Sequence, residues 1–289
     1  METLRALLEH EPIVRFAIFL AVFLTMAAWE IGAPRRPLAA SRGRRWIANL
    51  GILIVNTVLV RALFPAAAVG IAIYAEERGA GLLHAIDLAA GLKIVLALLA
   101  LDLAIYLQHV VFHAVPLLWR LHRAHHADLE IDVTTGTRFH PVEMLLSMGI
   151  KAAAILVIGA PVLAVLIFEI ALNATSMFNH SNVRLPRRLD TVLRWFLVTP
   201  DMHRVHHSIR REETNRNYGF NLPWWDRLFG TYQRQPRDGH QRMTIGIPEF
   251  RDPASCTTFS GILALPFIRL RSDTGGASDR LDHGAGPAR

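Results

Sequence analysis

The residues best able to do chemistry in this chain are histidines. There are 14 of them, and ten lie between residues 109 and 207. Eight form one pair spaced i, i+4 and two triplets spaced i, i+3, i+4, namely His109 and His113, then His122, His125 and His126, then His203, His206 and His207. On a helix these spacings share one face, so each group aims its imidazoles at one point.

Imidazoles gathered in this way are typical metal ligands. Eight of them exceed the three or four that a zinc site uses, so the sequence implies two metals. Zinc, copper, iron and nickel all accept imidazole, and the ligand type alone therefore does not name the metal. Isolated histidines near a membrane surface are usually solvated polar residues, which is our interpretation of His10, His84, His240 and His283.

Acidic residues near the clusters are candidates for a supporting role. Asp102 and Tyr106 continue the helical stripe of the first histidine pair. Asp102 could accept the outer N–H of a ligand imidazole, or it could be only an interfacial charge, and the spacing does not decide between them. Asp102, Glu143 and Asp201 could each offset the positive charge of bound metal.

Composition places these histidines in a membrane protein. Hydrophobic residues make up 52% of the 289-residue chain and charged residues only 19%, whereas a soluble domain carries about 25% charge. Disordered, collagen-like and coiled-coil chains are excluded, and one cysteine, Cys256, cannot form a structural disulfide. The net charge of +7 arises from residues that flank apolar runs, which favours anionic lipid headgroups over nucleic acid as the partner.

The apolar runs predict an all-α membrane fold of about four to five spanning or hairpin helices. The runs cover residues 13–33, 47–74, with a kink near Pro65, 86–108 and 142–179. Five arginines follow the first run, at positions 35, 36, 42, 44 and 45, so the positive-inside rule places that loop in the cytoplasm. The third run then delivers His109 to the same side, beneath a cytoplasmic, helical, histidine-rich cap.

The last apolar run is too long for a single span and contains Gly159, Ala160 and Pro161 at its centre. These helix-breaking residues predict a hairpin of two helices that enters and leaves on one side. Residues 189–198 predict an amphipathic helix, which either lies in the membrane interface or caps the soluble part. The expected domains are residues 1–98, residues 99–235 as the catalytic unit, and residues 236–289 as an extension whose tail beyond Ser272 is disordered.

Between Leu99 and Tyr232 the chain resembles the fatty acid hydroxylase/sterol desaturase superfamily of integral-membrane histidine-box diiron oxygenases. The resemblance rests on the three histidine groups, on Arg138-Phe139-His140-Pro141-x-Glu143, on Asn179-His180-Ser181-Asn182, and on Asn217-Tyr218-Gly219 followed by the run from Trp225 to Tyr232. It implies that the metal ligands are His109, His113, His122, His125, His126, His180, His203, His206 and His207. Asp102, His140 and Glu143 would then support the ligands or the local structure.

The resemblance also implies an activity. Two irons would activate O2, with electrons from an external donor such as a cytochrome b5-like or ferredoxin-type protein, to hydroxylate or desaturate a membrane lipid. No haem-binding segment is expected before residue 13 or after residue 233. Two alternatives come from other classes: a membrane metal-transport or metal-storage protein, which needs polar groups through its spans, and a membrane zinc hydrolase, which needs only three ligands.

Overall fold

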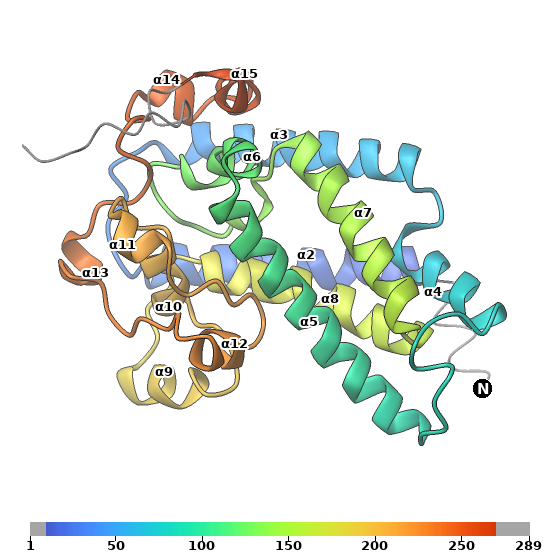
Figure 1. Ribbon diagram of the computed structural model, residues 1–289. Coiled ribbons are helices and arrows are strands. Elements are labelled where there is room, and N and C mark those ends of the chain that lie inside the picture. The colour runs from blue at the N-terminus through green and yellow to red at the C-terminus, as the bar shows by residue number, and fades with distance from the viewer. Residues whose placement is uncertain (1–9, 270–289) are drawn as a thin grey trace, which may run out of the picture.

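A bundle of long apolar helices carries a polar cap at one end in the computed structural model, which describes residues 10–269 (Figure 1). Five helical segments are long and apolar enough to cross a membrane: α2 (Glu11–Gly32), α3 with α4 (Arg42–Leu63 and Ala67–Glu77), α5 (Ala90–Ala114), α7 (Pro141–Ile158) and α8 (Val162–His180). The predicted all-α membrane fold is confirmed, and the described residues contain isolated β-bridges but no β-strand.

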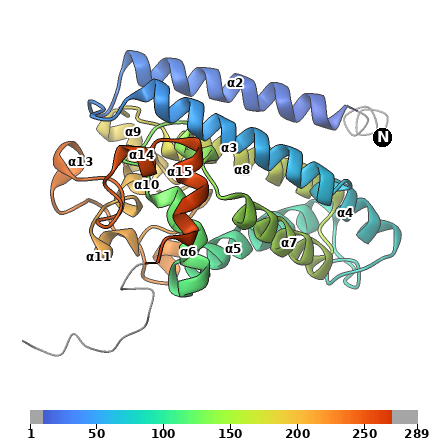
Figure 2. The same cartoon turned by 90° about the horizontal axis from the view of Figure 1, so that it is seen from above.

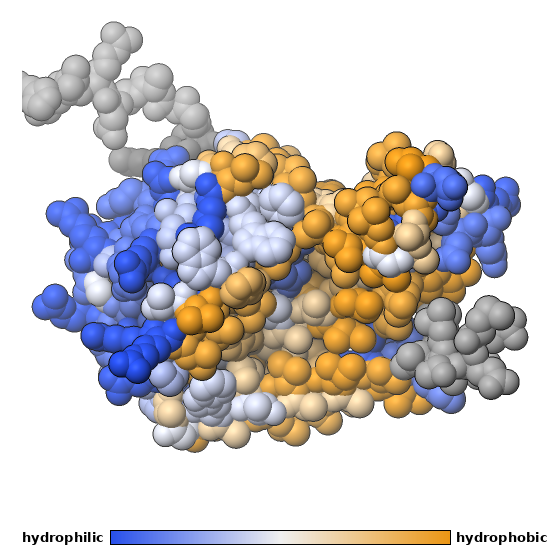
Figure 3. All heavy atoms as spheres, turned by 90° about the horizontal axis from the view of Figure 1, so that it is seen from below, coloured by the Kyte–Doolittle hydropathy of each residue, from blue (hydrophilic) through white to orange (hydrophobic). Residues whose placement is uncertain are grey.

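The apolar surface of the bundle forms a band between two hydrophilic ends. Figure 3 shows hydrophobic side chains over the spanning helices, with the polar cap at one end and a smaller polar region at the other. Many large apolar side chains on these helices are exposed, including Phe16, Ile54 and Val157. Lipid tails can cover such surfaces, whereas water cannot do so without a large free-energy cost. The chain is therefore an integral membrane protein.

The break in the second apolar run lies where proline predicts it. Helix α3 ends at Leu63 and α4 begins at Ala67, on either side of Pro65. The third run departs from its predicted bounds, because α5 starts at Ala90 and continues to Ala114. His109 and His113 therefore belong to the last turns of this helix, as their helical spacing predicts, and they are held by its hydrogen-bond ladder.

The predicted α7–α8 hairpin is confirmed. Helix α7 ends at Ile158, Gly159 adopts a left-handed conformation with φ +66°, and α8 begins at Val162. A side chain at residue 159 would meet the carbonyl oxygen of Ala80 at 2.8 Å, so glycine is required by both its conformation and its neighbour. Because the two helices run back to back, both outer ends of the hairpin lie at the cap (Figures 1 and 2).

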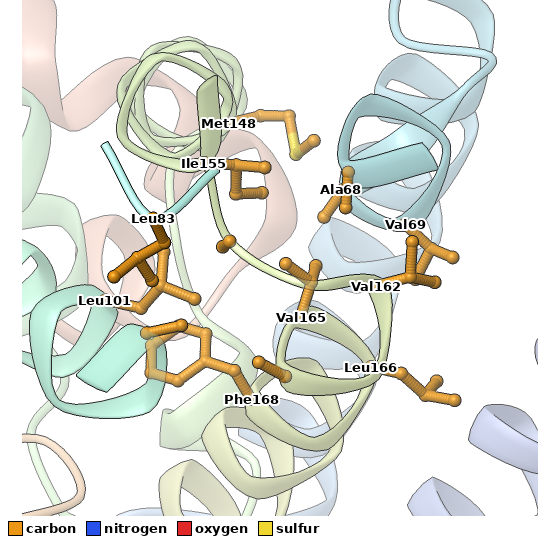
Figure 4. Close-up of a cluster of buried hydrophobic side chains, with 14 residues drawn as sticks. Ala68, Val69, Leu83, Leu101, Met148, Ile155, Val162, Val165, Leu166 and Phe168 are labelled. Carbon is orange, nitrogen blue, oxygen red and sulfur yellow. The ribbon is translucent and has the colours of Figure 1, made fainter. Parts of the chain in front are cut away.

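The hairpin packs on its neighbours through a cluster of buried apolar side chains. Figure 4 shows Met148 and Ile155 of α7, Val165 and Phe168 of α8, and Leu101 of α5 pointing toward one another. Leu83 and residues of α4 complete the cluster. Burial of this surface fixes the rotation of α5, α7 and α8, which sets the direction in which the histidines of α5 and α8 point.

The cap contains short helices joined by loops. They are α6 (Pro116–His126), η1 (Thr135–Thr137), α9 (Arg187–Leu193), α10 (Pro200–His206), α11 (Arg211–Thr214), α12 (Trp224–Leu228), α13 (Gly239–Arg242), α14 (Pro253–Cys256), α15 (Phe259–Ala264) and η2 (Leu265–Phe267). Helices α14, α15 and η2 pack against α3 and α6, with Ile52, Ala124, Cys256 and Ile262 in the interface. The predicted helix over residues 189–198 is shorter, because α9 ends at Leu193. The tail predicted beyond Ser272 lies outside the described residues.

Candidate metal centre

Nine histidines from four helices converge on the inside of the cap. Their ring nitrogens form two groups, and within each group the nearest nitrogens all lie within 4.8 Å of one another. The first group is His109, His113, His122, His126 and His206, and the second is His125, His180, His203 and His207. All nine histidines suggested by the sequence are thus brought together, at the junction of α5, α6, α8 and α10.

Each sequence triplet is divided between the two groups. From α6, His122 and His126 join the first group, whereas His125 joins the second. Helix α10 contributes His206 to the first group, and the second receives His203 and His207. A triplet therefore does not form a single site, contrary to the expectation that its three imidazoles point at one place. A helix packed between two neighbours can present histidines to either side.

Contacts between ring nitrogens have the spacing expected of ligands to a shared ion. His180 Nε2 lies 3.0 Å from His203 Nε2 and 3.2 Å from His125 Nε2. In the first group, His113 Nε2 lies 3.1 Å from His126 Nε2. Two nitrogens each about 2.1 Å from one metal ion lie roughly 3.0–3.4 Å apart. The donor atoms therefore fit metal ions in both groups.

The opposite ring nitrogen of most of these histidines is held by a hydrogen bond. Nδ1 of His109 and Nδ1 of His206 contact the carbonyl oxygens of Tyr218 and Arg216, both at 2.8 Å. In the second group, Nδ1 of His180 contacts the Ser176 carbonyl at 2.7 Å. A carbonyl only accepts, so Nδ1 carries the proton in these rings and Nε2 keeps its lone pair for a metal.

In the first group, three buried Nε2 atoms lack a hydrogen-bond partner among the described residues, those of His109, His122 and His206. In the second group, Nδ1 of His203 and of His207 is also buried without a partner. An unpaired buried polar atom is costly in a protein that does not use it. A metal ion would satisfy the three Nε2 atoms at once, which is a second sign that the donor set fits one.

Burial keeps the cap histidines neutral. Loss of solvation lowers the pKa of His125, His126, His203, His206 and His207 well below the ordinary value of 6.5, and the neighbouring imidazoles lower it further. Neutral imidazole is the form that binds metal, and a proton would compete with the ion. The site is therefore arranged to present unprotonated nitrogens at neutral pH.

The three acidic candidates have different positions. Glu143 accepts a hydrogen bond from His122 Nδ1 at 2.6 Å, so it orients that ring and places a negative charge beside the first group. Asp102 instead accepts hydrogen bonds from Asn221 and from the Trp225 indole, both at 2.8 Å, and its described hydrogen bonds reach no imidazole. Asp201 pairs with Arg35 and Arg204, on the outside of α10.

His140 is also separate from the clusters. Its Nδ1 accepts a hydrogen bond from the Val142 amide and caps the start of α7. It therefore supports the local structure, in the position that the neighbouring proline makes favourable for a helix start. Asp102 supports the site indirectly, because it holds the loop of residues 217–225, and the Tyr218 carbonyl of that loop contacts His109.

A buried charge network fixes the loop between α6 and α7. Arg45 of α3 donates to both carboxylate oxygens of Asp128, at 2.6 and 2.8 Å, and also pairs with Asp132. Arg138 donates to the Ala124 carbonyl at 2.8 Å, and the Arg138 carbonyl contacts His125 Nδ1 at 3.1 Å. The arginines hold the pKa of the Asp128 carboxyl down, to about 2.

Several supporting groups carried no usable signal in the sequence. The carbonyls of Arg138, Ser176, Arg216 and Tyr218 are backbone groups that every residue has, so residue type cannot reveal them. Asn215, whose Oδ1 contacts His113 Nδ1 at 3.2 Å, lies in a polar stretch without a distinctive spacing. The acidic residues Asp128 and Asp132 could have been noticed as charges directly after a histidine triplet.

The fold and the site together define an integral membrane protein with two buried histidine clusters suited to metal ions. Residues 94–231 match the family model described as fatty acid hydroxylase, so this segment of the chain is similar to that family. The resemblance recognised from the histidine motifs is thereby confirmed.

Characterised relatives share the same segment. The chain is 32% identical over 146 residues to ornithine lipid hydroxylase OlsE of Rhizobium tropici, covering 50% of this chain and 43% of the relative. It is 31% identical over 137 residues to alkylglycerol monooxygenase of Xenopus tropicalis, covering 47% and 30%. Human cholesterol 25-hydroxylase is 25% identical over 142 residues, covering 48% and 50%. The chain thus spans half or less of these relatives. No solved structure matches it.

Proposed function

We propose that the chain is a membrane-bound diiron oxidoreductase that uses O2 to hydroxylate or desaturate a C–H bond of a lipid. The observation that carries this proposal is the division of nine imidazoles, eight of them buried, into adjacent groups of five and four. Two metal ions side by side suit redox chemistry on an unactivated carbon, which no amino-acid side chain performs alone. The names of the relatives, two hydroxylases and a monooxygenase of lipids, support the same reaction class.

The proposed ligands are the nine histidines of the two groups, and bound iron would supply the activation of O2. The chain's own residues prepare the site. Backbone carbonyls and Glu143 fix the ring tautomers, and burial keeps the nitrogens unprotonated. Aromatic rings cover the clusters: Phe139 stacks on His125 at 4.6 Å between centroids, and Trp119 lies 4.9 Å from His113. These rings limit the access of water to the metals.

The two alternative functions fit the structure less well. A zinc hydrolase uses three protein ligands and an open position, fewer than either group offers. A cation transporter needs a path of ligands through the spans. The charges found between α2, α7 and α8 are instead a cluster in which Glu169 pairs with both Arg15 and Lys151. Two positive side chains around one carboxylate would repel a cation.

We also propose that the cap faces the cytoplasm and that a separate carrier, cytochrome b5-like or ferredoxin-type, delivers electrons there. The loop with five arginines lies on the cap side, since Arg35 pairs with Asp201 of α10 and Arg36 donates to the Met243 carbonyl. The positive-inside rule then assigns that side. The proposed catalytic unit is residues 99–235, with residues 1–98 as membrane helices and residues 236–289 as an extension.

Metal analysis of the purified chain tests the proposal. We expect two irons per chain, oxygen consumption with a chemical reductant, and a lipid product that has gained one oxygen atom or lost two hydrogen atoms. The change His126→Ala should remove at least one iron and abolish turnover, because His126 contacts members of both groups. His10→Ala is the matched control, since His10 is exposed and distant in sequence from the site.

The result that would overturn the proposal is equally definite. A chain that binds zinc with high affinity and hydrolyses a lipid ester without consuming O2 would be a hydrolase. Full iron content and full turnover in His126→Ala would remove that residue from the ligand set.

A further inference from the structure

A polar pocket lies on the outer side of α10, facing away from the histidines. It has a volume of about 610 Å³ and is lined by segments that are distant in sequence, from Arg35 to His240. Five arginines line it: Arg35, Arg187, Arg194, Arg227 and Arg234. Two aspartates, Asp190 and Asp201, are the acidic residues of the lining. The pocket therefore carries an excess of three positive charges.

Two of the arginines pair with a carboxylate within the protein, and three do not. Arg194 pairs with Asp190 at 2.6 Å, and Arg35 pairs with Asp201 at 3.0 Å. Arg187, Arg227 and Arg234 make no ion pair with a carboxylate among the described residues. Guanidinium groups that converge without a counter-ion repel one another, and an anion in the pocket would remove that repulsion.

The pocket also holds buried donors in fixed positions. The Arg227 guanidinium is sandwiched between the rings of Trp195 and Tyr232, 4.3 and 4.2 Å from their centroids, and its Nε has no hydrogen-bond partner. His240 is 4% exposed, and neither of its ring nitrogens makes a hydrogen bond, although Nε2 lies 3.6 Å from Asp201 Oδ2. A rigid stacked arginine with a free donor is suited to an oxyanion, because little freedom is lost on binding.

Exposed apolar side chains lie on or directly after α9 and α12, two of the elements that line this positive pocket. On the α9 side they are Leu189, Val192, Trp195 and Phe196, and on the α12 side they are Trp224, Leu228 and Phe229. Figure 3 shows apolar surface reaching from the spanning band into the hydrophilic cap end. Aromatic residues beside arginines are typical of the depth at which a membrane protein meets lipid headgroups.

We propose that this pocket binds a phosphate group, carried by a membrane lipid headgroup or free in solution. The excess positive charge, the unpaired arginines and the buried donors provide the recognition, and the apolar rim would contact the acyl chains of a lipid. The pocket is separated from the histidine clusters by α10, whose Asp201 faces the pocket and whose His203 faces the clusters. Its function therefore does not depend on the proposed iron chemistry.

Binding measurements on the full chain in a neutral detergent test this proposal. The three probes are dioctanoyl phosphatidic acid, dioctanoylglycerol, which has the same chains without phosphate, and inorganic phosphate. The pocket variant combines Arg187→Gln and Arg234→Gln, two exposed arginines whose loss should leave the fold intact. The control variant combines Arg44→Gln and Arg211→Gln, which are exposed arginines outside the pocket and make the same change in net charge.

We expect phosphatidic acid to bind about tenfold or more tightly than dioctanoylglycerol, and the pocket variant to lose that advantage while the control variant keeps it. Competition by inorganic phosphate would identify free phosphate as sufficient, and its absence would identify the lipid headgroup; either supports the proposal. Circular dichroism and metal content verify that both variants fold.

Three results would overturn the proposal. Wild type could bind the two lipids equally, or the two variants could lose affinity equally, which would indicate only a general charge effect. The pocket variant could also keep full lipid binding but lose binding of an acidic electron carrier, which would assign the pocket to a protein partner.

Discussion

At the scale of single residues, the site depends on which of the two groups each imidazole joins. His180 is the clearest case, because it stands alone in sequence at the end of α8. Its Nε2 lies 3.0 Å from His203 Nε2, and its Nδ1 is fixed by the carbonyl one turn earlier, at Ser176. With both nitrogens positioned, His180 completes the smaller group of four.

We therefore expect His180→Ala to lose iron selectively. Bound iron should fall from two to about one per chain, because the group of five keeps all its donors. Metal analysis by mass spectrometry measures the change. His140→Ala is the matched control: it removes a histidine of the same region that caps α7, and it should keep both irons. Full metal content and normal turnover in His180→Ala would make His180 a structural residue.

At the scale of elements, the site depends on how α3 is connected to the loop after α6. Asp128 is completely buried and accepts two hydrogen bonds from Arg45. This ion pair joins the second spanning segment to the segment that supplies the Arg138 carbonyl for His125. A buried pair contributes little compared with apolar packing, but removing one partner leaves a buried charge unbalanced.

We expect Asp128→Asn to destabilise the cap by roughly 3–5 kcal/mol at neutral pH. Because folding lowers the pKa of Asp128 from 3.8 to about 2, the folded state binds the proton less readily than the unfolded state. The contribution of the ionised Asp128 to the free energy of unfolding is complete above about pH 4 and is lost as the pH falls toward 2. Near-ultraviolet circular dichroism measures the free energy of unfolding between pH 7 and 2. This free energy should fall less steeply toward low pH in the variant than in wild type. Asp87→Asn, at an exposed site, should behave as wild type.

At the scale of the whole molecule, the chain is polar at both ends and apolar between them (Figure 3). The α2–α3 loop, the outer ends of the α7–α8 hairpin and the histidine clusters all lie at the cap end, and the α4–α5 connection lies at the other (Figures 1 and 2). This arrangement brings histidines from four helices to one location at the cap end of the bundle. It also predicts which segments a reagent can reach from each side.

Labelling of single cysteines in intact cells tests this topology. In a Cys256→Ser background, Glu77→Cys should react with a membrane-impermeant maleimide, whereas Ser41→Cys and Gln241→Cys should react only after the cells are opened, because we propose that the arginine-rich loop and the cap face the cytoplasm. All three positions are exposed. Different labelling of Ser41→Cys and Gln241→Cys would contradict the shared side of loop and cap. The reverse pattern for all three would place the metal centre outside.

The sequence by itself determined what depends on local pattern. Apolar runs of sufficient length identified the spans, and Pro65 and Gly159 identified where helices break, because backbone geometry at these residues is a local property. Imidazole spacings of three and four identified eight of the nine converging histidines for the same reason. The resemblance in sequence motifs was needed for His180, whose position has no periodic partner.

Only the tertiary structure decided how these parts combine. Helical period places His122, His125 and His126 on one face, but the rotation of α6 against α5, α8 and α10 divides them between two groups, and that rotation comes from packing. Asp102 and His140 make their hydrogen bonds away from the histidine clusters, and this too was decided by tertiary contacts rather than by spacing. The carbonyls that orient the imidazoles, and the pocket of arginines on the far side of α10, are brought together from segments distant along the chain, where residue spacing carries no information.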